Sequence, residues 1–82
     1  MDEVEIRKKI LKIIYDLNKI KRGYSVDSRD LMGKLDVKSE ELFANAKYLE
    51  KDGYIELEEF LGHEFKAKIT QNGIQKVEKM GF

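Results

Sequence analysis

The chain has 82 residues, the size of one small domain, and 41 % of them are apolar and patterned, so we expect a folded core rather than disorder. It contains no cysteine and a single histidine, which excludes disulfides, a cysteine nucleophile and zinc sites built on several histidines. The 16 basic and 16 acidic residues give zero net charge and no apolar run has the length of a membrane span, which argues against a uniformly basic nucleic-acid binder and against membrane contact and favours a cytoplasmic protein.

The first predicted element is a long helix over residues 2–22. Apolar residues recur at spacings of four and three residues from Ile6 to Ile20, which is the period of one helix face. Acidic residues lie in its first turn and basic residues in its last, where each favours the helix dipole. Gly23 follows as the expected end of the helix.

A second, shorter helix is predicted after an extended piece at residues 24–26. Asp27 or Ser28 is the expected N-cap, because side chains of both types accept hydrogen bonds from the first free backbone N–H groups. Leu35 belongs to the apolar face of this helix. Gly33 interrupts it at some cost in helix propensity, and close packing against a neighbouring helix would explain that glycine.

A third helix is predicted from Ser39, as its N-cap, to about Asp52, with Gly53 as its end. A turn of about 100° per residue, counted from Leu42, separates a buried from an exposed side. The residues on the buried side are Asn45, Ala46 and Leu49. The residues that point away are Glu40, Ala44, Lys47 and Lys51, with Glu41, Phe43 and Tyr48 on the flanks.

A hairpin is predicted next, because residues 54–58 and 65–69 both alternate with period two. A register that sets Ile55 opposite Ile69 puts the apolar residues of both strands on one face. The charge pairs that this register predicts on the outer face are Glu56 with Lys68 and Glu58 with Lys66. Thr70 is then the expected cap of a final helix.

The turn of the hairpin contains Gly62, which can supply the positive φ of a short loop. Phe60, Leu61 and Phe65 lie at this tip, beyond the expected reach of a small core. Exposed together with Phe43, they would form an apolar patch of the kind that binds a protein partner. Alternatively, Phe43 or Phe65 tucks under the hairpin or against the first helix.

The order of a long helix, a short extended piece, two close helices, a hairpin and a helix resembles the winged helix-turn-helix superfamily, as in small MarR- and PadR-like bacterial and archaeal transcription regulators. The residues that carry the resemblance are 30–35, 37, 39–42, 48–55 and 69–74. It implies an α+β, mainly α fold: one winged-helix domain over residues 1–82, with a three-helix core, a two-stranded β-hairpin wing and a C-terminal helix. An excess of Lys and Glu without Pro, Cys or Trp is also typical of thermophiles.

The resemblance implies binding of double-stranded DNA in transcription regulation, with the helix of residues 39–52 in the major groove. The matching positions on that helix are Ala44, Lys47, Tyr48 and Lys51. The flanking residues expected to meet DNA, mainly at phosphates, are Arg29, Lys38, Ser39 and His63. About four phosphate contacts would give a slope near −3.6 in log affinity against log salt. Alternatively, Lys47 and Lys51 form a solvated face.

A different function is a winged helix that binds another protein through its acidic, aromatic wing. Residues 36–64 hold three basic and nine acidic residues, a local balance of −6 that opposes contact with phosphates. The candidate contacts are Phe43, Phe60, Leu61 and Phe65. An accessory domain of replication or RNA machinery is a third alternative.

A homodimer is also expected, through the first helix or the C-terminal helix. Leu11 and Ile14 make the apolar stripe of the first helix wider than one core contact needs, and Met80 and Phe82 are further candidates. Neighbouring acidic pairs face different directions and no glycine-rich phosphate loop is present, so we expect no enzyme, no catalytic residue, no metal and no cofactor.

Overall fold

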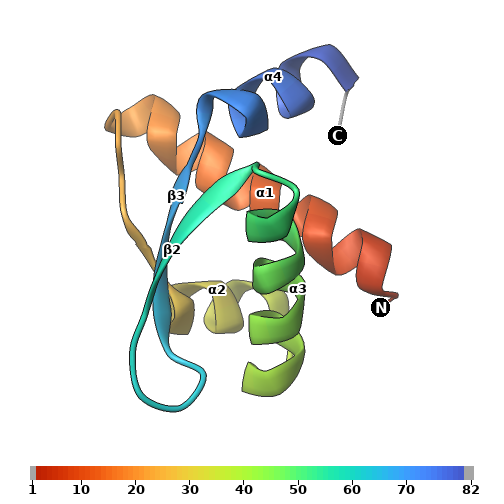
Figure 1. Ribbon diagram of the computed structural model, residues 1–82, viewed down its shortest axis with the longest axis vertical. Coiled ribbons are helices and arrows are strands. Elements are labelled where there is room, and N and C mark those ends of the chain that lie inside the picture. The colour runs from red at the N-terminus through yellow and green to blue at the C-terminus, as the bar shows by residue number, and fades with distance from the viewer. Residues whose placement is uncertain (1, 81–82) are drawn as a thin grey trace.

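The computed structural model describes residues 2–80 and shows an α+β fold that is mainly helical (Figure 1). Its elements in chain order are α1 (Glu3–Ile20), β1 (Val26–Asp27), α2 (Ser28–Leu35), α3 (Ser39–Lys51), β2 (Ile55–Glu59), β3 (Phe65–Ile69) and α4 (Gln71–Met80). The strands form one antiparallel sheet in the order β1-β3-β2. The helices predicted from the sequence are therefore confirmed, and β1 adds a short third strand to the predicted hairpin.

Helix α1 lies at the centre of the packing and contacts α2, α3, α4 and β3. Asp2 caps its start by accepting a hydrogen bond from the backbone N–H of Glu5 at 2.9 Å. Leu11 and Ile14 are fully buried, so the prediction that they are left over for a dimer surface is wrong. The apolar stripe is wide because the helix is contacted from several sides. Phe82 and the side chain of Met80, the other residues predicted for that surface, lie outside the described part of the chain.

Helices α2 and α3 are joined by a tight turn. Asp36 adopts the left-handed conformation (φ 54°, ψ 49°) and its backbone N–H donates to the carbonyl of Met32 at 3.0 Å. That bond ends α2 and lets α3 begin three residues later. Gly33 is exposed, and a Cβ built on it would meet no atom within 4 Å, so the predicted close packing at this glycine is wrong.

The caps of these two helices differ. Asp27 caps α2 by accepting from the backbone N–H of Arg29 at 3.1 Å, as one of the two predicted alternatives. Ser39, the predicted cap of α3, is instead the first residue inside that helix, and Lys38 occupies the cap position without a side-chain hydrogen bond. The hydroxyl of Ser39 donates to a carboxylate oxygen of Glu40 at 3.1 Å.

The register of the hairpin agrees with the prediction. Ile55 pairs with Ile69, Leu57 with Ala67, and the charged residues pair as expected on the outer face. None of the four charged side chains Glu56, Glu58, Lys66 and Lys68 forms an ion pair with another residue in the described range, however. The register is thus fixed by apolar burial on the inner face. The predicted charge pairs lie opposite each other in the register but do not form ion pairs.

A compact junction connects the end of α3, the start of β2 and the start of α4. The hydroxyl of Thr70 donates to the carbonyl of Gly53 at 2.6 Å and accepts from the backbone N–H of Gly73 at 3.0 Å. A Cβ built on Gly73 would lie 2.1 Å from the carbonyl oxygen of Tyr54, which shows how closely the two backbones approach. Gly53 itself has φ 83°, a conformation that glycine adopts without strain.

Candidate interaction surface on α3 and the hairpin

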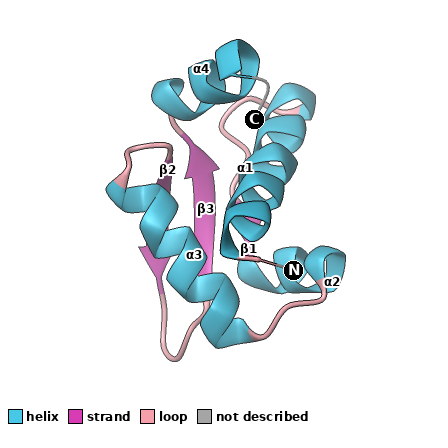
Figure 2. Cartoon of the chain, turned by 90° about the vertical axis from the view of Figure 1, so that its right-hand side faces the viewer, coloured by secondary structure: helices cyan, strands magenta, loops and turns pink. Residues whose placement is uncertain are grey.

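The outward side of α3 is left uncovered beside the hairpin. In Figure 2 no other element crosses the side of α3 that faces the viewer, and the hairpin lies next to it. The inner side is held by buried Leu42, Asn45, Ala46 and Leu49, as predicted. The buried side-chain amide of Asn45 has a hydrogen-bond partner, because it donates to the carbonyl of Glu41 at 2.8 Å. This anchoring fixes which side chains of α3 point outward.

Lys47, at the centre of that outward side, is held between two carboxylates. Its Nζ lies 2.6 Å from Oε2 of Glu59 on β2 and 3.0 Å from Oε1 of Glu50 on α3. The hydrogen bonds that Lys47 donates to Glu59 and then to Glu50 raise the pKa of Lys47 above its ordinary value. Two acids therefore surround one cation, and the middle of the face has a local negative surplus.

Arg29, at the start of α2, is also paired with the hairpin. Its guanidinium lies 3.2 Å from Oε1 of Glu64, and 75 % of the arginine side chain and 53 % of the glutamate side chain are exposed. Water and salt screen such a pair strongly, so it constrains Arg29 only weakly.

Tyr48 has a partner that the sequence did not indicate. The guanidinium of Arg7 on α1 lies 3.9 Å from the centre of the Tyr48 ring, a cation–π contact, while the tyrosine keeps 52 % exposure. Arg7 follows a buried residue of α1, and only the packing of α1 against α3 brings it to this surface. It therefore adds a cation to the face of α3 near Tyr48.

The remaining cations of the face lie at the two ends of α3. Lys38 precedes the helix and Lys51 ends it, about 20 Å apart along the axis at 1.5 Å per residue. Both are exposed, and neither forms an ion pair with another described residue. Ala44, midway between them, is exposed and small. The predicted cations thus do not merge into one stripe, because the pairing of Lys47 interrupts it.

The start of α3 is acidic. Hydrogen bonding from its own backbone N–H, and then from the Ser39 hydroxyl, lowers the pKa of Glu40, and the charges of His63 and Lys38 act in the same direction. Glu41 beside it is exposed as well. These two carboxylates offset the helix dipole, and they also repel phosphates at this end of the helix.

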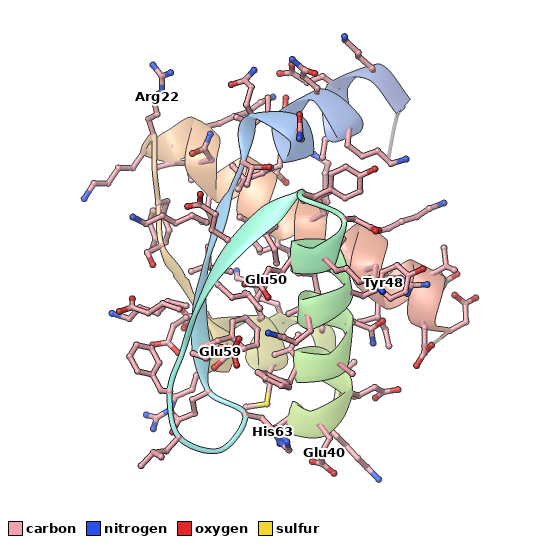
Figure 3. All side chains as sticks on the ribbon, viewed as in Figure 1. Arg22, Glu40, Tyr48, Glu50, Glu59 and His63 are labelled. Atoms are coloured by element: carbon pink, nitrogen blue, oxygen red, sulfur yellow. The ribbon has the colours of Figure 1, made fainter. Side chains whose placement is uncertain are left out.

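The hairpin tip is docked onto α3 by aromatic contacts. The ring of His63 lies 5.2 Å from that of Phe43, and Phe43 lies 6.3 Å from Phe65. Phe65 is only 1 % exposed, and its backbone N–H donates to the hydroxyl of Ser28 at 3.1 Å, so its predicted place in an exposed patch is wrong. Phe43 is half-buried under the hairpin. His63 is exposed but oriented by this stack, near Glu40 in Figure 3.

Two residues of the predicted apolar patch remain on the surface. Leu61 is 91 % exposed and Phe60 is 49 % exposed. Gly62 follows with φ 71°, and the backbone N–H of Phe60 donates to the carbonyl of Glu64 at 2.9 Å, which closes the turn. The tip is therefore an ordered loop that presents two large apolar side chains to solvent.

Among residues 2–80, no group of three or more His, Asp or Glu side chains is arranged to hold a metal ion. None of the helices in the same range combines the length and the apolar character that a membrane crossing requires.

Comparisons with models of protein families, with curated protein sequences and with solved structures found no match.

Proposed function

We propose that the chain is a winged-helix domain that binds double-stranded DNA in transcription regulation, with α3 in the major groove and the β2–β3 hairpin as the wing. The observation that carries the proposal is the uncovered outward side of α3, set beside the hairpin and joined to α2 by the left-handed turn at Asp36. The major groove is wide enough to admit one α-helix. The α2–turn–α3 unit with a flanking hairpin matches the geometry that presents such a helix.

The contacts follow from the exposed residues of that side. Ala44 is small, so the middle of α3 can approach base edges closely. Lys51 and Tyr48 supply donors for phosphates or base edges toward the end of the helix. Lys38 and Ser39 contact the DNA backbone at the start of the helix, and His63 on the wing contacts an adjacent phosphate.

Lys47 and Arg29, which are paired with carboxylates, contact DNA only by exchanging those carboxylates for phosphates. The Lys47–Glu59 and Arg29–Glu64 pairs are exposed, and such pairs open readily because water already screens them. A phosphate can then replace the carboxylate, but the carboxylate stays nearby and repels it. We therefore expect modest affinity, with Glu59 acting against binding.

The test is fluorescence anisotropy with a mixed-sequence duplex at low salt. Lys51→Glu should weaken binding by about tenfold or more, because it removes one phosphate contact and adds repulsion. Lys34→Glu is the matched control, since Lys34 is an exposed lysine of α2 outside the proposed contacts, and it should leave affinity within about twofold. No binding by the unaltered protein at about 50 mM salt, or equal losses in both variants, would contradict the proposal.

A specific observation favours a second function, protein binding through the wing. Phe60 and Leu61 are large apolar side chains held in solvent on an ordered turn, and apolar groups so placed are typical of protein contacts. If the wing binds protein, replacing both residues by serine should abolish partner capture while Lys47→Glu leaves it intact. The opposite pattern would reject this function and leave the DNA proposal standing.

A further inference from the structure

Two segments at opposite ends of the molecule carry opposite charge around exposed apolar side chains. Residues 58–64, which we name the tip, contain three acids and no Lys or Arg. Residues 19–25, which we name the basic corner, contain three cations and no acid. In Figure 1, drawn with the longest axis vertical, the tip is the turn at the bottom and the basic corner is the end of α1 and the following loop at the top. The molecule measures 32 Å along that axis.

The basic corner is concave. An open hollow of about 390 Å³ is lined by Lys21, Gly23, Tyr24, Ser25 and Lys68. The side-chain oxygen of Asn18 accepts a hydrogen bond from the backbone N–H of Gly23 at 2.8 Å, and φ 79° at that glycine turns the chain away from α1. Ile20, which precedes Lys21 in the sequence, does not line the hollow, and it is 79 % exposed.

The cations of this corner are not neutralised within the chain. Lys21, Arg22 and Lys68 form no ion pair with any residue in the range 2–80. Figure 3 shows Arg22 extending away from the body of the molecule. The corner therefore combines a hollow, an exposed aliphatic side chain and available positive charge.

The tip is convex and has the complementary character. Leu61 is the more exposed of its two large apolar side chains, Phe60 precedes it in the chain, and the His63–Phe43 contact holds the loop in place. Of its three acids, Glu58 makes no ion pair with any described residue. Glu59 shares Lys47 with Glu50, and Glu64 pairs with Arg29 while 53 % of the glutamate side chain stays exposed. The tip is a fixed acidic knob with an apolar centre.

From this complementarity we propose that the chain associates with itself head to tail, with the tip of one copy seated in the basic corner of the next. Leu61 and Phe60 enter the hollow beside Ile20 of the neighbouring copy, where Lys21 and Lys68 meet the acids of the tip. The occupant is a second copy because an acidic turn with exposed apolar side chains and a basic hollow, which are opposite in charge, are both present on the same chain. The inference identifies the partner in the second, protein-binding function and does not depend on DNA binding.

The geometry sets the kind of assembly. Tip and corner lie on opposite ends of one molecule, so each copy uses both surfaces and the contact is heterologous. Association then extends into chains of copies rather than stopping at a closed dimer. Pairing of two tips or of two corners is disfavoured, because each would set like charges against each other.

Sedimentation equilibrium without DNA tests the proposal. At about 50 mM salt and concentrations up to about 1 mM, the weight-average mass of the unaltered protein should rise past that of a dimer, and about 500 mM salt should reduce it. Leu61→Glu, and separately Lys21→Glu with Arg22→Glu, should each weaken association by at least about tenfold. Lys9→Glu with Lys34→Glu, a matched charge reversal at exposed lysines elsewhere, should keep the rise in mass.

A mixing experiment distinguishes this interface from any other. The Leu61→Glu variant keeps an intact corner and the Lys21→Glu/Arg22→Glu variant keeps an intact tip, so an equal mixture should form a one-to-one dimer and nothing larger. Circular dichroism of each variant checks that it is folded. A monomeric unaltered protein at about 1 mM, or self-association that persists in either variant, overturns the proposal. The first result leaves a different protein as the partner of the tip, and the second points to a symmetric contact.

Discussion

The junction between α3, β2 and α4 differs in kind from the outward side of α3. At the junction, Thr70 bonds both Gly53 and Gly73, and Gly73 is in close contact with the backbone of Tyr54. These groups are all bonded to or in close contact with other groups of the same chain. On the outward side of α3, the central cation is paired, the flanking cations are not, and Ala44 faces solvent. The residues that carry the winged-helix resemblance are concentrated at the junction, so the resemblance speaks for architecture more than for binding.

The largest expected effect on stability comes from a substitution in the junction. Gly73→Ala places a Cβ 2.1 Å from the carbonyl oxygen of Tyr54, a contact that only backbone movement can relieve. We expect a loss of about 1–3 kcal/mol or more in the free energy of unfolding, measured by urea denaturation. Gly33→Ala is the matched control: it meets no atom within 4 Å and lies in a helix, so it should be neutral or stabilise by up to about 1 kcal/mol. Equal effects of the two substitutions would contradict the close approach.

The next effect removes one bonding group of the junction. Thr70→Val keeps the shape of the side chain but leaves the carbonyl of Gly53 and the backbone N–H of Gly73 without their partner. A loss of about 1–2 kcal/mol in the free energy of unfolding is expected. Ser39→Ala, at the residue that the sequence wrongly marked as a cap, should lose clearly less because its hydroxyl bonds only to exposed Glu40. A larger loss at Ser39 would show that the cap of α3 is misplaced.

These two regions also differ in how far the sequence predicts them. Helix periods and the Thr70 cap follow from local patterns, because each depends on residues a few positions apart, and the hairpin register follows from two neighbouring segments joined by one turn. The burial of Phe65 and the contact of Arg7 with Tyr48 depend on how distant elements pack, and no local pattern carries that information.

The candidate site shows the same limit. The outward position of Lys47 is predictable from the helix period, but its pairing with Glu59 requires the hairpin to lie against α3. For the same reason the wide apolar stripe of α1 predicts a surplus Leu11, although the packing of several elements against α1 buries this residue. The sequence predicts well which residues share a face of a helix or strand. It predicts poorly which other elements that face contacts.

The Lys47–Glu59 ion pair on the outward side of α3 can be tested by removing its carboxylate. Glu59→Gln removes a carboxylate that competes with phosphate for Lys47, so we expect DNA affinity to rise by about two- to fivefold in anisotropy at low salt. Lys47→Ala should weaken binding more in the Glu59→Gln background than in the unaltered protein. Glu56→Gln, the same chemical change on the outer face of β2 away from α3, is the control. If both glutamine variants behave alike, only the net charge matters and Lys47 has no special role.

The smallest expected effect concerns pH. Because the pKa of Glu40 is lowered in the folded protein, first by its own backbone N–H and then by Ser39, its charged form favours folding. That contribution is present above the ordinary pKa of 4.5 and is lost as the pH falls through the lower folded value. Glu40→Gln should therefore narrow the drop in melting temperature between neutral and acidic pH. A drop as large as that of the unaltered protein would show that Glu40 is not involved.

An amide NMR titration of the protein with a duplex at low salt tests most directly whether α3 and the wing bind DNA. If α3 and the wing bind DNA, the backbone amides of residues 38–51 and of His63 shift, while those of α4 and the basic corner stay in place. Shifts confined to residues 19–25 and α4 would place the duplex at the opposite end of the molecule and contradict the account.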